Sequence, residues 1–386
     1  MKVLYTTGKS MYLAENGKEI ELPSYRAMQY RQTIEEIQQN KLWKTTGRGA
    51  QFMGVAPADT RVTDAVIGGV ALYQEHFLYT LQLDASGGIY RRSFSEKPQP
   101  EGHIYSGNDI RPGDLAVHEE NLATCVHYPN GAVHLALFRL PSSVYTVITD
   151  GDSCESNPRW SHDGRLLYFS TAGIARENGL IAAYSPRAAA CYNINTDKME
   201  MLIEDEKHDI LSPCEDAQGN LWYIRQPYHM QEKNKGNTFL SALKDVLLFP
   251  FWLVKALFGF LNAFSILFGG KPAADSGMGS DLKSRQKSDK ELFFEGRMLD
   301  AEKNLKANKK SGDPYAGIMS ASRVLVRRAS DGTEEVLAKG VLDYALCGDG
   351  GVVYSNGSHI LHRKPDGTVE NIVKTRMAAR LQVVNN

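Results

Sequence analysis

Three segments of the chain repeat one short pattern, and this repetition constrains the fold more than any other feature. Residues 158–170, 213–225 and 344–356 align without gaps. Each contains a glycine, two apolar residues two and three positions later, and a tyrosine four positions after the glycine. Because glycine suits a tight turn and the apolar run suits a buried strand, each segment predicts a turn followed by a β-strand. The chain is therefore expected to consist of repeated units of short strands.

A fourth, partial copy opens the chain. Residues 3–8 match residues 352–357, and both copies continue to an Asn-Gly or Asp-Gly dipeptide, at 16–17 and 366–367. Such dipeptides favour two-residue turns between antiparallel strands. We expect the last strand, near residues 380–384, to pair with the unit at the N-terminus and close a ring.

The spacing of the repeats gives the size of one unit. Gly164 and Gly219 are 55 residues apart, whereas Gly219 and Gly350 are 131 residues apart. Residues 231–317 differ in composition from the rest of the chain, and without these 87 residues the second spacing falls to 44. A unit of about 40 to 55 residues made of hairpin-linked strands is typical of a β-propeller blade, which buries its faces only against neighbouring blades.

Residues 157–170, with the sequence NPRWSHDGRLLYFS, resemble the WD-like repeat of the TolB-type β-propeller family. The same repeat forms the propeller of prolyl-oligopeptidase-like enzymes. His162 stands where the family usually has proline, and two other segments of the chain match the repeat only in part. The resemblance implies a propeller fold but little about activity, because propellers of this family have many roles.

We therefore expect an all-β fold, a six-bladed β-propeller with seven blades as the alternative, that carries a helical, hydrophobic insertion in the fifth blade. Helical spacing over residues 25–41 also predicts a short helix in the first blade. The expected domains are the first part of the propeller at 1–230, the insertion at 231–317 and the closing part of the propeller at 318–386. The expected blades cover residues 1–60, 64–112, 114–152, 156–207, 209–230 joined to 318–339, and 341–386.

The insertion contains the most apolar stretch of the chain. Residues 246–268 form a run of 23 residues, long enough to span a bilayer, and residues 291–310 have a helical pattern. Basic residues flank the apolar run on both sides, so the positive-inside rule keeps both of its ends on one side of a membrane. Lys255, Gly259 and Asn262 fall on one narrow helical stripe. This pattern predicts an amphipathic helix that lies within one leaflet.

The apolar surface of this helix is the expected contact with a membrane or a partner. The expected contact residues are Phe249, Phe251, Trp252, Leu253, Leu257, Phe258, Phe260, Leu261, Phe264, Leu267 and Phe268. Between residues 231 and 310 there are 14 Lys and Arg and nine Asp and Glu, which gives a net charge of +5 against −6 for the rest of the chain. This charge suits an anionic cytoplasmic leaflet, where each nearby cation contributes about 1 kcal/mol. A protein partner, self-association and packing on the propeller are the alternatives.

Three further features bear on location and partners. The first residues contain no apolar stretch of signal-peptide length, which predicts a cytoplasmic protein. The five cysteines are spread singly with no C-x-x-C pair, which predicts reduced thiols rather than disulfides or a zinc site. The whole chain has a net charge of −1, which gives no reason to expect binding to nucleic acid.

The sequence contains no catalytic or cofactor motif that we recognise. It has no G-x-S-x-G nucleophile motif, no H-E-x-x-H pair and no EF-hand loop, and Gly8-Lys9-Ser10 lacks the upstream glycine of a phosphate-binding loop. We therefore expect no catalytic residue, no cofactor and no bound metal. The leading hypothesis is a non-catalytic binding scaffold with an unidentified ligand at the propeller mouth, attached peripherally to the cytoplasmic face of a membrane or to a partner.

The alternative hypothesis is a hydrolase or lyase that acts on a small ester, lactone or glycan with a metal ion in the central channel. Some propeller lactonases and esterases hold such an ion with acidic residues and histidine around the channel. The carboxylates with comparable expected positions here are Asp109, Asp114, Asp152, Glu155, Asp209, Glu215 and Asp343. This hypothesis requires at least three such ligands to converge.

Overall fold

In the computed structural model of the protein, residues 1–46, 65–83, 86–177, 180–228, 291–294 and 297–384 are described. Within these residues the chain is mostly β, and its helices are α1 (Tyr25–Thr46) and α5 (Ala301–Lys310). The described strands form four sheets of four strands, one sheet of nine and one hairpin of two.

The sheets follow the order of the chain. The first contains β27 (Ala379–Val384), β1 (Lys2–Thr6), β2 (Met11–Glu15) and β3 (Lys18–Leu22). The second contains β4 (Val66–Tyr73), β5 (His76–Gln82), β6 (Gly87–Arg92) and β7 (Gly102–Gly107). The nine-stranded sheet contains β8 (Arg111–His118), β9 (Asn121–His127), β10 (Val133–Arg139), β11 (Tyr145–Val147), β12 (Ser153–Trp160), β13 (Leu166–Glu177), β14 (Leu180–Tyr184), β15 (Ala188–Asn193) and β16 (Lys198–Ile203).

The remaining sheets lie in the second half of the chain. One contains β17 (His208–Glu215), β18 (Leu221–Pro227), β21 (Val324–Arg328) and β22 (Glu334–Lys339). Another contains β23 (Asp343–Leu346), β24 (Val352–Ser355), β25 (His359–Arg363) and β26 (Val369–Lys374). The hairpin contains β19 (Glu291–Phe294) and β20 (Arg297–Asp300).

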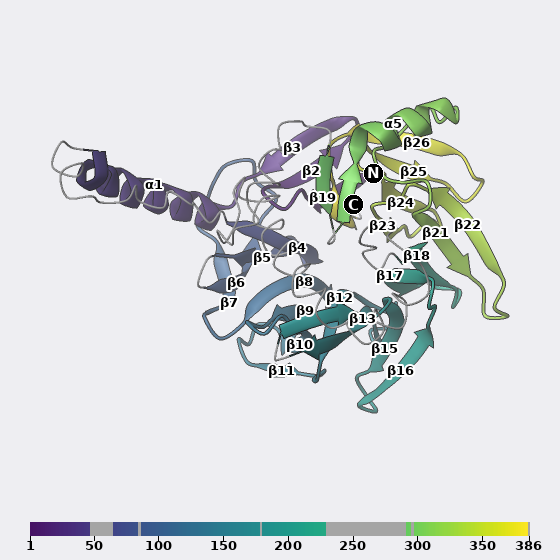
Figure 1. Cartoon of the computed structure of the whole chain (residues 1–386), viewed down its shortest axis with the longest axis horizontal. Helices are drawn as coiled ribbons and strands as arrows, with labels where there is room; N and C mark the ends of the chain where they lie inside the picture. The colour runs from purple at the N-terminus through teal and green to yellow at the C-terminus, as the bar shows by residue number, and fades with distance from the viewer. Residues whose placement is uncertain (47–64, 84–85, 178–179, 229–290, 295–296, 385–386) are drawn as a thin grey trace, which may run out of the picture.

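The sheets are arranged around a common centre in a β-propeller manner (Figure 1). The nine-stranded sheet consists of two antiparallel parts, β8–β11 and β12–β16, that are joined by one parallel pairing between Val133 and Cys154. We call these two parts and the four four-stranded sheets the strand groups. The expected closure is confirmed, because β27 pairs with β1 and places Val383 opposite Val3.

The core lies between the faces of successive strand groups. One cluster joins Val3 and Tyr5 of the first group to Val353 and Ile360 of the last. The repeated glycines have the predicted turn conformation: the φ angles of Gly164, Gly219 and Gly350 are 67°, 81° and 81°. Each of these turns leads into a strand whose tyrosine is buried, so the repeat supplies both the turn and a core side chain.

Helix α1 confirms the helix expected in the first unit and projects outward from the ring (Figure 1). Glu101 holds its N-terminus by accepting hydrogen bonds from the N–H groups of Tyr25 at 3.1 Å and Arg26 at 3.2 Å. A carboxylate is stabilised at this end of a helix, where peptide N–H groups are unpaired. Glu101 also accepts the hydroxyl hydrogen bond of Tyr79 at 2.7 Å, which ties the helix to β5.

The fold interrupts one sheet with a long excursion. Strands β18 and β21 are neighbours, with Tyr223 opposite Val326, although residues 228–323 separate them in the chain. The helix expected over residues 246–268, with all of its contact residues, lies outside the described residues. No helix in the part of the chain that is described has the length and apolar character needed to cross a bilayer.

The prediction of a helix across residues 291–310 is wrong in its first half. Residues Glu291–Phe294 and Arg297–Asp300 pair as the hairpin β19–β20, and α5 begins only at Ala301. The physical reason is the cap at Asp300, whose carboxylate accepts the N–H of Lys303 at 2.9 Å. An aspartate at this position starts a helix rather than continuing one.

Substitution of Leu381 tests the closure of the ring. Leu381 lies in β27 and its side chain is 1% exposed. We expect Leu381→Ala to lower the free energy of unfolding by about 2 to 5 kcal/mol, because it removes buried methyl groups and leaves a cavity. Met199→Ala is the control, since Met199 lies on β16 and is 49% exposed. Urea titration of both variants measures the effect, and equal midpoints would contradict the closure as a source of stability.

Candidate functional site

One strand at the edge of each strand group contacts an edge strand of a neighbouring group. Strand β4 contacts β8, β8 contacts β12, β12 contacts β17, and β27 contacts both β23 and β4. We call β4, β8, β12, β17, β23 and β27 the inner strands. Polar side chains on these strands, and on the strands beside them, form the candidate site.

The inner strands share a local irregularity. The pairing register shifts within β4, β8, β12 and β17, and again where β27 pairs with β1. Such shifts are β-bulges, which release a peptide group from the hydrogen-bond ladder. Gly68 and Gly113 lie at the first two bulges, and Asn157, Ser212 and Arg380 have positive φ angles of 56°, 53° and 57° at the others. The bulge is therefore a repeated part of the fold.

The peptide N–H at three of these bulges bonds to a side chain of the neighbouring strand group. These inter-group bonds run from Asn157 N–H to Asp114 at 2.9 Å, from Ser212 N–H to Ser170 at 3.0 Å and from Leu381 N–H to Asp343 at 2.9 Å. A buried N–H without an acceptor costs about 1 to 3 kcal/mol, so each bond satisfies a group that the bulge would otherwise leave unpaired. Two of the predicted ligand carboxylates thus have structural partners.

Two arginines form ion pairs with the carboxylates of Asp114 and Asp343. Arg380 lies 2.6 Å from the second oxygen of Asp114, and Arg159 lies 3.0 Å from the second oxygen of Asp343. The Arg159 guanidinium also donates to the carbonyl of Tyr344 at 2.7 Å and lies 4.5 Å from the centre of its ring. Both oxygens of each carboxylate therefore already have one partner, and a metal ion there would compete with an arginine for the negative charge.

His127 lies near these groups at the end of β9. A Cβ atom on Gly113 would lie only 2.4 Å from His127 Nε2, so the glycine makes room for the ring. Burial lowers the pKa of His127; Asp114 opposes this effect, and the charges of Arg111 and Arg380 add to it. The imidazole is surrounded by protein but still reaches solvent, and it is neutral at neutral pH.

The five other predicted carboxylates also have specific partners. Asp109 accepts hydrogen bonds from the hydroxyl groups of Tyr105 and, at 2.8 Å, Tyr145, and Asp152 forms an ion pair with Arg176. Glu155 accepts a hydrogen bond from Thr171 at 3.1 Å and lies 3.3 Å from His134. Asp209 accepts the backbone N–H of Arg187 at 3.0 Å, and Glu215 accepts the hydroxyl group of Tyr168 at 2.7 Å. Within the described residues, none of the seven candidates belongs to a group of three donors close enough to share a metal ion.

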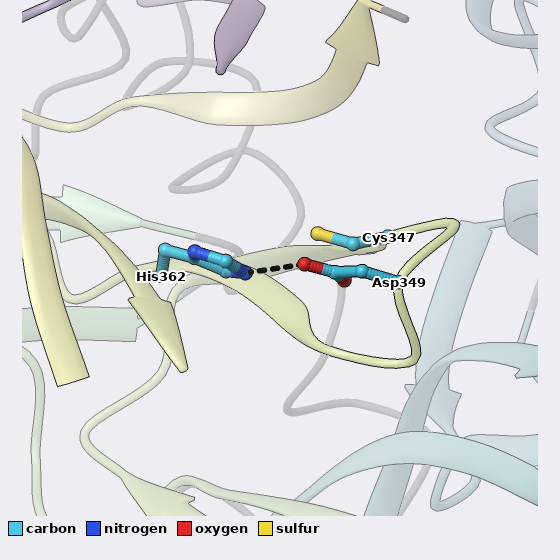
Figure 2. A group of neighbouring side chains, drawn as sticks. All are labelled: Cys347, Asp349 and His362. Atoms are coloured by element: carbon cyan, nitrogen blue, oxygen red, sulfur yellow. Dashed lines mark ion pairs between the residues drawn. The ribbon is translucent and has the colours of Figure 1, made fainter. Parts of the chain in front are cut away.

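One such group does occur in the described part of the chain, and it contains none of the predicted carboxylates. It consists of Cys347, Asp349 and His362 (Figure 2). The sequence does not reveal this group, because no two of its residues have the spacing of a known metal-binding motif. The register of β24 and β25, with Val353 opposite His362, brings the histidine back to the turn that carries the other two residues.

Among known proteins, this chain is similar in structure to TolB proteins. No family model and no curated protein matches the chain. TolB from Acinetobacter baumannii is 9% identical with a TM-score of 0.47, and the match covers 98% of this chain and 65% of that protein. A putative TolB from Agrobacterium tumefaciens is 11% identical with a TM-score of 0.42, covering 81% and 82%. A puromycin-hydrolyzing peptidase from Mycobacterium tuberculosis is 11% identical with a TM-score of 0.35, covering 58% and 33%.

Asp343→Ala tests the structural role of Asp114 and Asp343, which we call the axial carboxylates. It removes the acceptor of the Leu381 N–H and leaves the Arg159 charge, whose side chain is 19% exposed, without its partner. We expect the free energy of unfolding to fall by about 3 to 5 kcal/mol. The matched control is Glu120→Ala, which breaks an ion pair with Arg139 between side chains that are 59% and 75% exposed, and should cost less than about 1 kcal/mol. Equal losses in the two variants, measured by urea titration, would refute this role.

Proposed function

We propose that the chain is a non-catalytic binding scaffold: a six-bladed β-propeller attached peripherally to the cytoplasmic face of a membrane, or to a partner, by an inserted apolar segment. The domains of this proposal are the propeller at 1–230 and 318–386 and the insertion at 231–317. An unidentified ligand at the propeller mouth is part of the same proposal.

The blade count is supported by the six strand groups. Each strand group contributes one inner strand, and the β18–β21 pairing assigns the excursion to a single blade, the fifth. In this proposal, the strands before and after the excursion therefore belong to one ring. A seventh blade would require strands from residues outside the described ranges.

The observation that carries the scaffold proposal is that the axial carboxylates already have partners within the protein. Asp114 and Asp343 are each bound by an arginine and a peptide N–H, so these carboxylates hold neighbouring strand groups together. A carboxylate whose charge is paired with an arginine is less available to bind an ion or to accept a proton from a substrate. The alternative, a hydrolase or lyase with a channel metal ion, has less support because its seven candidate ligands have other partners.

The attachment proposal depends on the sequence of the insertion. The run over residues 246–268 is too apolar for an exposed loop, and the net charge of +5 between residues 231 and 310 favours an anionic surface. The ring closes without this segment, since β18 pairs directly with β21. The end of the insertion does pack on the propeller, where Tyr315 contacts a core cluster and its carbonyl accepts a hydrogen bond from Asn356 at 2.6 Å, so the attachment proposal concerns residues 246–268.

Vesicle flotation tests the attachment. We expect the full chain to float with vesicles that contain anionic lipid, to bind neutral vesicles less, and to dissociate as salt is raised. Trp252→Glu or Phe258→Glu should weaken binding about tenfold or more, because burying an aromatic side chain contributes about 1.5 to 3 kcal/mol.

The control variant places the same charge elsewhere. Val144 is 74% exposed on the propeller, so Val144→Glu should bind vesicles as the unaltered protein does. If the full chain stays unbound at every lipid composition, membrane attachment is wrong. Sedimentation of the same proteins then distinguishes self-association, which Trp252→Glu should abolish, from a monomer that needs a different partner.

A further inference from the structure

Three donor side chains of different chemistry face one another at the start of the last strand group (Figure 2). Cys347 and Asp349 lie in the turn between β23 and β24, and His362 lies on β25. The cysteine sulfur, a carboxylate oxygen and an imidazole nitrogen all lie within 4.8 Å of one another. His362 Nε2 and Asp349 Oδ2 are 3.5 Å apart.

The turn fixes the positions of two of these donors. Gly350, with a φ angle of 81°, donates its N–H to the carbonyl of Cys347 at 3.1 Å, and the N–H of Cys347 bonds to the carbonyl of Gly351 at 3.0 Å. The N–H of Gly351 also bonds to Asp349 Oδ1 at 2.9 Å. Asp349 is thereby oriented through one oxygen while its other oxygen faces His362.

Gly351 keeps the space between the donors open. A Cβ atom at this position would lie 2.8 Å from the carbonyl oxygen of Arg363, 2.9 Å from His362 Nε2 and 3.1 Å from Asp349 Oδ1. A larger residue would therefore press both on the neighbouring strand and on the histidine and the carboxylate. The φ angle of Gly351 is not in the left-handed region, so close approach rather than backbone conformation accounts for glycine here.

His362 provides an independent sign of a missing partner. Its side chain is 8% exposed, and its Nε2 atom is buried without a hydrogen bond, because the 3.5 Å approach of Asp349 does not have hydrogen-bond geometry. Leaving a buried polar nitrogen unpaired costs about 1 to 3 kcal/mol, so buried imidazole nitrogens are nearly always satisfied. This one points into the group of donors.

The donor set matches one class of ligand. Zn²⁺ binds nitrogen, sulfur and oxygen ligands at about 2.0 to 2.3 Å, which in a tetrahedron separates the ligand atoms by about 3.3 to 3.8 Å. His362 Nε2 and Asp349 Oδ2 are already at such a separation, and the Cys347 sulfur, which lies within 4.8 Å of both, would have to move closer by at most about 1 Å. Hard cations such as Ca²⁺ and Mg²⁺ prefer oxygen ligands only. We propose that Cys347, Asp349 and His362 bind Zn²⁺ or a similar divalent transition-metal ion, with the fourth position open to solvent.

The protonation of Cys347 defines the binding reaction. Burial and the nearby Asp349 raise the pKa of Cys347 to about 12, although the backbone of Val353 opposes this. Binding replaces the S–H bond of the thiol with a metal–thiolate bond and releases the proton to water.

Cobalt titration of the full chain tests the site. The protein, treated with a chelator under reducing conditions, should bind one equivalent of Co²⁺ and show a thiolate-to-cobalt absorption band that Zn²⁺ abolishes. Cys347→Ser should lose the band, and His362→Gln should weaken binding at least tenfold. Cys191→Ser is the matched control, because Cys191 is a buried free thiol on β15 outside this group, and it should keep the band.

Two variants keep the test decisive if substitution of a buried ligand disturbs folding. Asp349→Asn changes a side chain that is 52% exposed, and Gly351→Ala keeps all three ligand residues while its Cβ displaces His362 and Asp349. We expect Zn²⁺ to raise the melting temperature of the unaltered protein, and both variants should weaken Co²⁺ binding and remove that rise. The proposal is overturned if the full chain shows no thiolate band, or if Cys347→Ser and Asp349→Asn bind the ion as tightly as the Cys191→Ser control.

Discussion

The rest of the structure depends on the bond between a bulged inner strand and a side chain of the neighbouring strand group. The bulge releases a peptide N–H from its own sheet, and Asp114, Ser170 or Asp343 accepts it. Flat apolar faces alone allow two sheets to slide past each other, because hydrophobic contact has no direction. At three junctions between strand groups, a hydrogen bond at a fixed place sets the position of one sheet against the next.

The axial carboxylates and the turn between β23 and β24 differ in how their polar groups are paired. Asp343 and Asp114 form ion pairs with Arg159 and Arg380. At the turn, one oxygen of Asp349 faces the Nε2 atom of His362, which has no hydrogen bond. Among these groups, the unpaired polar atom therefore lies at the turn and not among the acids on the inner strands.

The sequence predicted the repeated elements well and the side-chain partners poorly. Glycine and tyrosine spacing identified the turns and buried strands, and the matching ends identified the pairing of β27 with β1. Asp114 and Asp343 were candidate ligands around the channel, and their arginine partners come from strands distant in the chain. The group around His362 depends on the register between β24 and β25, which residue spacing does not reveal. The helix over 291–310 failed in its first half because the residues before Asp300 pair as a hairpin and Asp300 caps the helix that follows. The helix over 246–268 stays a prediction.

The pairing of β27 with β1 has a consequence for biosynthesis. β1 receives its inner neighbour only from β27, which follows far later in the sequence, so the edge of β1 lacks that partner until β27 has been made. Unpaired strand edges invite pairing with other chains. A chain in which β27 is not yet made or not yet docked thus exposes an aggregation-prone edge that the completed pairing conceals.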